Sequence, residues 1–354
     1  MDNSSTVFII NIRVGIADLE NLSGLCAVCS VILYMFTVLI NILVFSVIVL
    51  KSLHQPMHLF FSNLLFNGII VSSALLPKLA ADILSENRSM APLSCYFQMF
   101  FIQLFFFTEQ IALCIMAYDR YIAICNPLRY SQIMTDVKVC KLIICSWVLS
   151  IFASVIGIIL CAGQPVCYFV IEKPYCDYYS FVKLLCSNYS VYYYCSSVVT
   201  VITTAVPMTI ILYSYIRIIQ ICLQKSKDYR WKAFQTCFTH LLVFAIYVTG
   251  VLFTFIQNRL PIKSIPQGLH VFLSLEWLIV PPLANPLIYG LRTKQIRTAI
   301  VEIINSKAFT EKFPNCIKIR GKQQFCRKSR FCTSLKNINN SQLKEATDRN
   351  GRAK

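Results

Sequence analysis

The chain has 354 residues and a formal net charge of +17, with 33 Lys and Arg against 16 Asp and Glu. Hydrophobic residues make up 56% of the chain, and its mean hydropathy is +0.61. Soluble domains are about 45–50% apolar, so these values exclude an ordinary soluble domain, and the 13% share of aromatic residues is typical of a membrane bundle.

Seven apolar segments follow one another along the chain, and each is close to the roughly 20 residues that a membrane-spanning helix needs. They occupy about residues 25–50, 59–81, 95–118, 142–161, 194–216, 234–257 and 269–291. The sequence therefore predicts an all-α fold, a seven-transmembrane helix bundle over residues 25–291. Residues 1–24 mix charged and polar side chains without the pattern of a signal peptide, so we expect a short, exposed amino terminus.

The distribution of Lys and Arg in the short loops predicts the orientation of the chain in the membrane. These residues are more numerous, and closer to the helix ends, after the first, third, fifth and seventh segments. That side is expected to be cytoplasmic, which places the amino terminus outside the cell. The glycosylation sequences Asn-x-Ser/Thr agree, because they fall on the outer side at Asn3, Asn87 and Asn188.

Positive charge is concentrated near the carboxyl end of the chain. From Arg292 onward there are sixteen Lys and Arg and four Asp and Glu. A basic segment can bind nucleic acid, but beside a membrane the anionic inner leaflet is the expected partner, so we predict membrane lipid and no nucleic acid. Residues 292–305 are expected to form a short amphipathic eighth helix at the interface, and residues 306–354 a basic, disordered cytoplasmic tail.

Polar residues inside the apolar segments need partners within the bundle, because an amide or a charge is costly in lipid. Asn41 lies deep in the first segment and should face the other helices. Glu109 lies in the middle of the third segment, and Asp119 and Arg120 lie near its end. Glu109 and Arg120 are eleven residues apart, about three helical turns, so they share one face.

The third segment ends in Met-Ala-Tyr-Asp-Arg-Tyr-Ile-Ala-Ile-Cys-Asn-Pro, residues 116–127. Charge at a helix end can serve only as an interfacial anchor, but this string resembles the end of the third membrane helix of odorant receptors, a branch of the rhodopsin-like G-protein-coupled receptors. Within the string at 232–241 given below, the residues Gln235 and Thr239 are more similar to those of fish members of the family than to those of mammalian members. The other similar strings are Pro-Met-His-Leu-Phe-Phe-Ser-Asn-Leu at 56–64, Ser-Tyr-Ile-Arg-Ile at 214–218, Lys-Ala-Phe-Gln-Thr-Cys-Phe-Thr-His-Leu at 232–241 and Asn-Pro-Leu-Ile-Tyr at 285–289.

The resemblance implies a receptor that binds small odorants and activates a heterotrimeric G protein of the Gs or Golf type, which raises cAMP. It implies no enzymatic activity and no cofactor. Agonist would shift the population toward a bundle whose sixth helix has moved away from Arg120, with Asp119 holding Arg120 at rest and Tyr215 and Tyr289 meeting it in the active state. The residues that the resemblance assigns to activation and coupling are Asp119, Arg120, Tyr121, Tyr215, His240, Asn285, Pro286 and Tyr289.

One position departs from the family pattern. Many members have an acidic residue five positions after Asn63, where this chain has Gly68. The resemblance makes Glu109 one half of a sodium or proton site, whereas the missing acid favours a protonated Glu109 with a structural role.

Three cysteines, Cys167, Cys176 and Cys186, fall in the loop between the fourth and fifth segments. Cysteines in an oxidising compartment tend to pair, and the resemblance implies bonds of Cys95 with Cys176 and of Cys167 with Cys186. No metal site is expected, because the cysteines of the apolar segments are interpreted as small buried hydrophobic residues.

Helical spacing predicts the walls of a ligand pocket in the outer half of the bundle, between the third, fifth, sixth and seventh helices. The predicted lining is Ile102, Gln103, Phe105, Phe106, Thr200, Thr204, Tyr247, Val251 and Thr254. Apolar and aromatic walls with a few hydroxyls and one amide suit a small neutral or weakly polar molecule. The alternative is that these aromatic residues only fill the core.

Other classes of membrane protein fit the sequence less well. A membrane transporter or channel is the second hypothesis, but the chain lacks inverted repeats and a charged pathway through several helices. An intramembrane hydrolase is weaker still, since His-Glu-x-x-His and Gly-x-Ser-x-Gly are absent. Ligand-dependent signalling without substrate flux would distinguish a receptor from a transporter.

Overall fold

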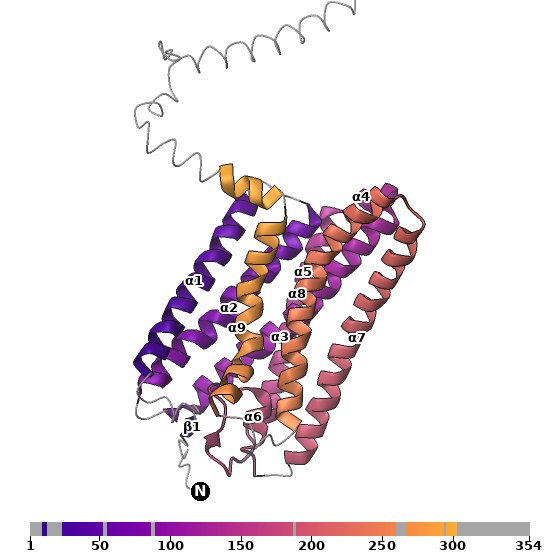
Figure 1. Ribbon diagram of the computed structural model, residues 1–354. Helices are drawn as coiled ribbons and strands as arrows, with labels where there is room; N and C mark the ends of the chain where they lie inside the picture. The colour runs from indigo at the N-terminus through magenta and orange to yellow at the C-terminus, as the bar shows by residue number, and fades with distance from the viewer. Residues whose placement is uncertain are drawn as a thin grey trace, which may run out of the picture. The chain divides into compact units, whose positions relative to one another are not determined.

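A computed structural model describes residues 9–12, 23–51, 55–85, 89–186, 189–259, 267–293 and 295–302. Seven helices in these ranges are long and apolar enough to span a membrane, which confirms the predicted bundle (Figure 1). They are α1 (Ser23–Leu50), α2 (Pro56–Leu84), α3 (Pro92–Cys125), α5 (Asp136–Cys161), α7 (Tyr189–Leu223), α8 (Lys227–Arg259) and α9 (Gln267–Arg292). The predicted glycosylation sites at Asn3, Asn87 and Asn188 and the predicted tail from residue 306 lie outside the described residues.

Several helices extend beyond their apolar segments. α2 and α3 each begin with a proline, Pro56 and Pro92, at a position where the missing N–H would have no partner inside the helix. α5 begins after the N-cap Thr135, whose side chain accepts a hydrogen bond from the backbone N–H of Lys138. Apolar length underestimates these helices because their end turns are polar and still helical.

α3 is the central helix of the bundle and contacts α2, α5, α7 and α8. Met99, Phe105 and Leu113 of α3 are completely or almost completely buried. α1 packs on α2 and α9, and α8 packs along α9. Side chains of α3 can therefore contact most of the other helices, and the sites described below are built around it.

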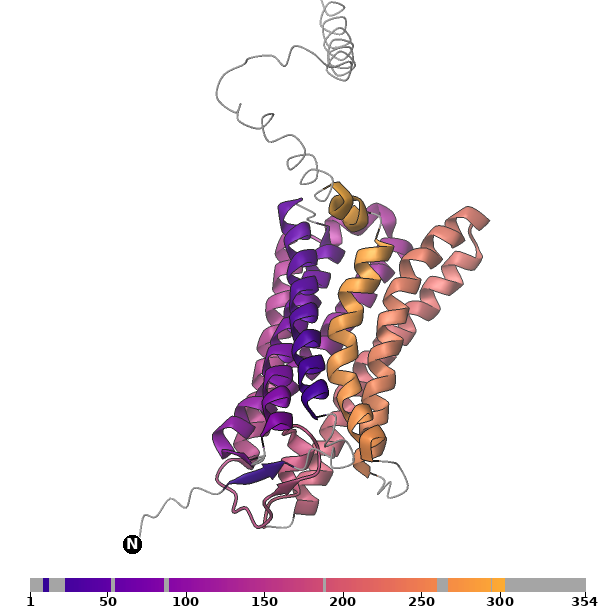
Figure 2. The same cartoon turned by 60° about the vertical axis from the view of Figure 1, so that its left-hand side comes forward.

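Short elements that the sequence did not predict lie before the first long helix and in the connections between the long helices. They are β1 (Ile10–Ile12), β2 (Ser89–Met90), the 3-10 turn η2 (Pro127–Arg129), α4 (Tyr130–Ile133), β3 (Val170–Ile171) and α6 (Tyr178–Val182). The strands form one sheet in the order β2-β1-β3, with β1 antiparallel to β2 and parallel to β3. The sheet lies at the end of the bundle opposite α4 (Figure 2).

The amino-terminal segment differs in part from the expectation of an exposed terminus. Ile10 is fully buried and Ile12 is 3% exposed, because strand pairing fixes this segment against the loop that follows α5. Residues 295–302, which lie within the range predicted for an interfacial helix, are helical.

Candidate functional site

A cavity of about 310 Å³ lies between the spanning helices near the end of the bundle that carries the sheet. Its walls come from α3, α5, α7, α8 and α9, and α6 with its N-cap closes it. Six residues of the predicted lining are among its walls: Ile102, Gln103, Phe106, Thr200, Val251 and Thr254.

Three residues of the predicted lining do not line this cavity. Phe105 is fully buried and packs its ring against Trp277, with 6.2 Å between ring centres. Thr204 and Tyr247 lie at a separate space of only about 10 Å³. Thr204 follows Thr200 by one turn in α7, and Tyr247 precedes Val251 by one turn in α8, so both residues lie one turn away from the cavity wall.

The prediction that four helices form the cavity was also incomplete, because α5 and the loop after it supply much of the wall. The residues that the prediction missed on these two elements are Ala153, Ile156, Gly157, Leu160, Asp177, Tyr178 and Tyr179. Large apolar residues of α5 such as Val148, Leu149 and Phe152 are exposed, so hydrophobicity alone does not identify the inward face of this helix. The signal present in the sequence is a row of small residues on one face of α5, namely Ser146, Ser150, Ser154 and Gly157, of which the three serines are buried.

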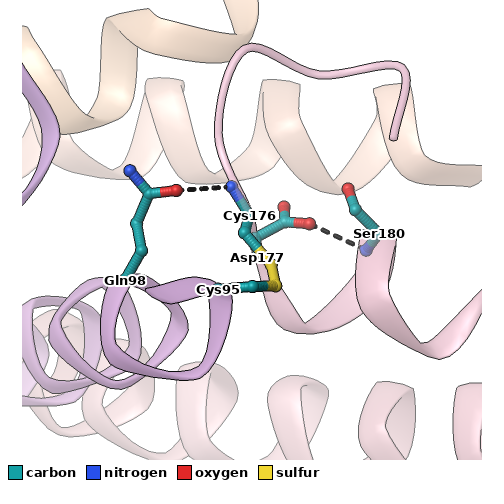
Figure 3. The surroundings of a disulfide bond; sticks show 5 residues. All are labelled: Cys95, Gln98, Cys176, Asp177 and Ser180. Atoms are coloured by element: carbon teal, nitrogen blue, oxygen red, sulfur yellow. Dashed lines mark hydrogen bonds between the residues drawn. A yellow bond between two sulfur atoms is a disulfide. The ribbon is translucent and has the colours of Figure 1, made fainter. Parts of the chain in front are cut away.

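Two disulfides fix the loop between α5 and α7: Cys95 is bonded to Cys176, and Cys167 to Cys186. Cys176 is completely buried, and its backbone N–H donates to Gln98 Oε1 at 2.7 Å. Figure 3 shows how this bond and the disulfide attach the loop to the first turns of α3. The loop therefore forms a fixed cover over the cavity.

Asp177 is the one acid among the described residues of the cavity wall, and its charge is already compensated. Its carboxylate forms a buried ion pair with Lys173 and accepts the backbone N–H of Ser180 at 2.8 Å, which caps α6. Burial by itself raises the pKa of the Asp177 carboxyl, but the Lys173 ammonium and the Ser180 N–H outweigh burial and place that pKa below its usual range. No free carboxylate of the described wall is left to bind an amine.

The covering loop also contacts α9 through a fully buried tyrosine. The Tyr175 hydroxyl donates to the carbonyl oxygen of Ser274 at 2.8 Å and accepts from Trp277 Nε1 at 3.2 Å. Trp277 lines the cavity and packs its ring near Phe105 and Phe106 of α3. A molecule in the cavity would thus contact a side chain that joins the loop, α3 and α9.

Glu109 links three helices in the middle of the bundle. It is fully buried, and its two carboxylate oxygens accept from Asn67 Nδ2 of α2 and Asn285 Nδ2 of α9, both at 2.9 Å. The sequence identified Glu109 and Asn285 as polar residues of interest but missed Asn67, which its position beside Gly68 could have indicated.

Gly68, the position at which the resemblance led us to expect an acid, allows close packing of α2 on α9. A Cβ added to Gly68 would lie 3.2 Å from the Cβ of Pro282 and 3.5 Å from Asn41 Oδ1. Asn41 Nδ2 donates to the carbonyl oxygen of Pro282 at 2.9 Å, so Asn41 faces the bundle as expected. The packing of α2 on α9 therefore fills the space that a carboxylate side chain at position 68 would need.

At the opposite end of α3, Asp119 and Arg120 form an ion pair. Arg120 Nε donates to Asp119 Oδ2 at 3.0 Å, and the hydroxyl of Tyr130 in α4 donates to Asp119 Oδ1 at 2.8 Å. Burial, followed by the neighbouring Asp119 carboxylate, raises the pKa of Tyr130, so the hydroxyl keeps its proton as a donor. The adjacent Tyr121 is half-buried.

His240 of α8 joins α3 and α7. Its Nε2 lies 3.0 Å from the carbonyl oxygen of Leu113, which can only accept, so Nε2 carries the proton and Nδ1 accepts from the Tyr215 hydroxyl at 2.6 Å. The Tyr289 hydroxyl is buried without a hydrogen-bond partner in the described part of the chain, and Pro286 follows Asn285 inside α9. Tyr215 is thus engaged by His240 in this arrangement.

Comparison with known proteins agrees with this architecture. The family profile described as olfactory receptor matches residues 29–307. The chain is 34% identical to human olfactory receptor 52Z1P over 290 residues, which cover 81% of this chain and 96% of that protein. It is 32% identical to human olfactory receptor 2K2 over 84% of this chain and 94% of that protein, and 34% identical to mouse olfactory receptor 1E16 over 77% and 87%. The chain therefore belongs to the olfactory receptor family of G-protein-coupled receptors, which are multi-pass plasma-membrane proteins and not enzymes.

Proposed function

We propose that this receptor binds small neutral odorants in the cavity beneath the disulfide-fixed loop. The observation that supports this most strongly is the cavity itself: five spanning helices line it, and apolar and aromatic side chains dominate its wall. Burial of apolar surface is favourable by about 25 cal/mol per Å², so a small hydrophobic odorant gains most of its affinity from such walls.

Agonist binding would act on the far end of the bundle through α3 and α8, which both line the cavity. Phe106 and Val251 meet the ligand, and the Tyr247 hydroxyl donates to the carbonyl oxygen of Phe106 one turn below. Further along α8, His240 donates to Leu113 of α3. An agonist that binds more tightly when α8 has separated from α3 would shift the receptor population away from the conformation that has this His240 contact.

G-protein coupling is assigned to the end of the bundle with Asp119 and Arg120, which we place in the cytoplasm. The excess of Lys and Arg in the loops on that side supports this orientation, with the amino terminus outside. We further propose a G protein of the Gs or Golf type, so that agonist raises cAMP. Separation of α8 from α3 would free Tyr215 from His240 and open a surface around Arg120 for the G protein.

The cavity is tested by replacing Phe106 and following agonist potency. Phe106→Leu should shift potency by different amounts for different agonists, because each ligand shape contacts the lost ring differently. Tyr247→Phe removes only the hydroxyl bond to Phe106 and should shift all agonists alike. The matched control is Phe152→Leu, because Phe152 is 64% exposed on the lipid side of α5.

Dose–response curves of G-protein activation are compared at equal surface expression, measured with an antibody to an added terminal tag. If Phe106→Leu reaches the surface and every agonist keeps its wild-type potency, the ligand binds elsewhere.

A further inference from the structure

The apolar cavity contains two polar side chains whose hydrogen-bonding capacity is not used within the described part of the chain. Gln103 Oε1 of α3 and Thr254 Oγ1 of α8 are buried and have no hydrogen-bond partner there. Both residues line the cavity. By contrast, the Thr200 hydroxyl lies 2.6 Å from that of Tyr179, so this pair satisfies itself. Buried polar groups without partners are rare in native proteins and are explained by a water or a ligand.

The position of the Gln103 amide depends on a glycine of the facing helix. A Cβ added to Gly157 of α5 would lie 2.7 Å from Gln103 Oε1 and 2.9 Å from Nε2. Contacts this short do not occur, so any other residue at Gly157 would push the amide out of its place. Gly157 therefore gives Gln103 the room to lie along the wall instead of filling the cavity.

We propose that the Gln103 amide, placed by Gly157, and the Thr254 hydroxyl select odorants that have an apolar body and one neutral oxygen group, a hydroxyl or a carbonyl. The inference rests on the proposed function, since it names the ligand class of the same cavity. An amide and a hydroxyl can each donate or accept, so together they match either oxygen group. Gly157 acts here as a specificity-determining residue through Gln103.

Charged and purely apolar ligands are disfavoured for separate reasons. A ligand ammonium group would have no free acid to pair with, because Asp177 is already paired with Lys173. A ligand carboxylate would meet no free cation among the described wall residues. Either charge would therefore be buried without compensation. A hydrocarbon would leave Gln103 Oε1 and Thr254 Oγ1 buried without a hydrogen bond.

The ligand class is tested with the full-length wild-type receptor and sets of odorants that share a skeleton. One set is hexane, hexanol, hexanal, hexylamine and hexanoate, with equivalent sets on branched, cyclic and aromatic skeletons. In every set that activates the receptor, the alcohol or carbonyl compound should be about tenfold or more stronger than the hydrocarbon, and the charged members should be inactive. An amine, carboxylate or hydrocarbon as the strongest member overturns the inference. No activation of the receptor by any of these sets would contradict the proposed odorant function itself.

The residues are tested with near-isosteric substitutions. Gln103→Met and Thr254→Val should each lower the potency of the oxygenated odorants by about two- to tenfold, as expected for one lost hydrogen bond. Gly157→Ala should have a similar effect, whereas Gly24→Ala, where an added Cβ meets no atom within 4 Å, should have none.

The dependence of Gly157 on Gln103 is measured by a double-mutant cycle. In a Gln103→Ala receptor the amide is gone, so adding Gly157→Ala should leave potency unchanged. An equal loss from Gly157→Ala in both backgrounds would overturn the role of Gly157. If Gly157→Ala does not reach the surface, the inference is tested by Gln103→Met and Thr254→Val alone. Equal losses of potency for oxygenated and hydrocarbon agonists in these variants would refute it. A change of agonist potency in Phe106→Leu would still support odorant binding in the cavity.

Discussion

Cys176→Ser is expected to reduce the surface level of the receptor to near background. The lost bond joins Cys95 to a residue 81 positions away and fixes a loop whose residues Tyr175 and Cys176 are completely buried. A native disulfide contributes about 2–5 kcal/mol, a large part of the roughly 5–15 kcal/mol that stabilises a typical domain. Without it the loop would leave the cavity open and Trp277 without its Tyr175 partner.

Surface levels are measured by antibody labelling of intact cells, with total receptor measured after permeabilisation. Cys29→Ser is the matched control, because Cys29 is a free and exposed cysteine of α1, and this variant should behave as wild type. Normal delivery of Cys176→Ser, or free thiols at Cys95 and Cys176 in peptide mapping, would show that the bond does not hold the loop.

Arg120→Ala is expected to reach the surface and to lose at least about 99% of its agonist-stimulated signal. The Arg120 side chain is 14% exposed and its ion-pair partner Asp119 is fully buried, yet Asp119 keeps the hydrogen bond from Tyr130 when Arg120 is removed. The loss should therefore fall on coupling and not on folding. Arg120→Lys keeps the charge without the planar fork of donors and should recover only part of the signal.

The control for this prediction is Arg129→Ala, which removes a basic residue of the exposed turn η2 on the same side of the bundle. It should alter signalling several-fold at most. A wild-type response from Arg120→Ala would remove Arg120 from the coupling mechanism, and its retention inside the cell would show that the ion pair is needed for folding.

The fold was predictable because the length of each apolar segment indicates a membrane-spanning helix. Each spanning helix contains a run that only a helix can bury in lipid, and motif positions such as Asp119, Arg120 and His240 identified helix ends and faces. Asn41 and Glu109 were found because a polar group in an apolar run demands a partner. Their partners, Pro282, Asn67 and Asn285, come from helices distant in sequence and required the three-dimensional packing.

The site was predictable in direction but not in depth. Helical periodicity selected Phe106 of α3 and Val251 and Thr254 of α8, and all three line the cavity. It could not show where the helices diverge enough to leave space, and Tyr247, which was predicted with them, lies at the smaller space instead. Short strands such as β1 escaped prediction because three residues paired across loops leave no local pattern.

The measurement that tests the central claim most directly uses purified receptor and G protein in lipid vesicles. Agonist-stimulated nucleotide exchange on the G protein is compared between Ala153→Trp, whose indole would fill the cavity, and the neighbouring Phe152→Trp, whose indole would face lipid. Odorant binding in this cavity predicts that Ala153→Trp loses the agonist response while Phe152→Trp keeps it. An undiminished agonist response from Ala153→Trp, or no exchange with the wild-type receptor, would contradict the account.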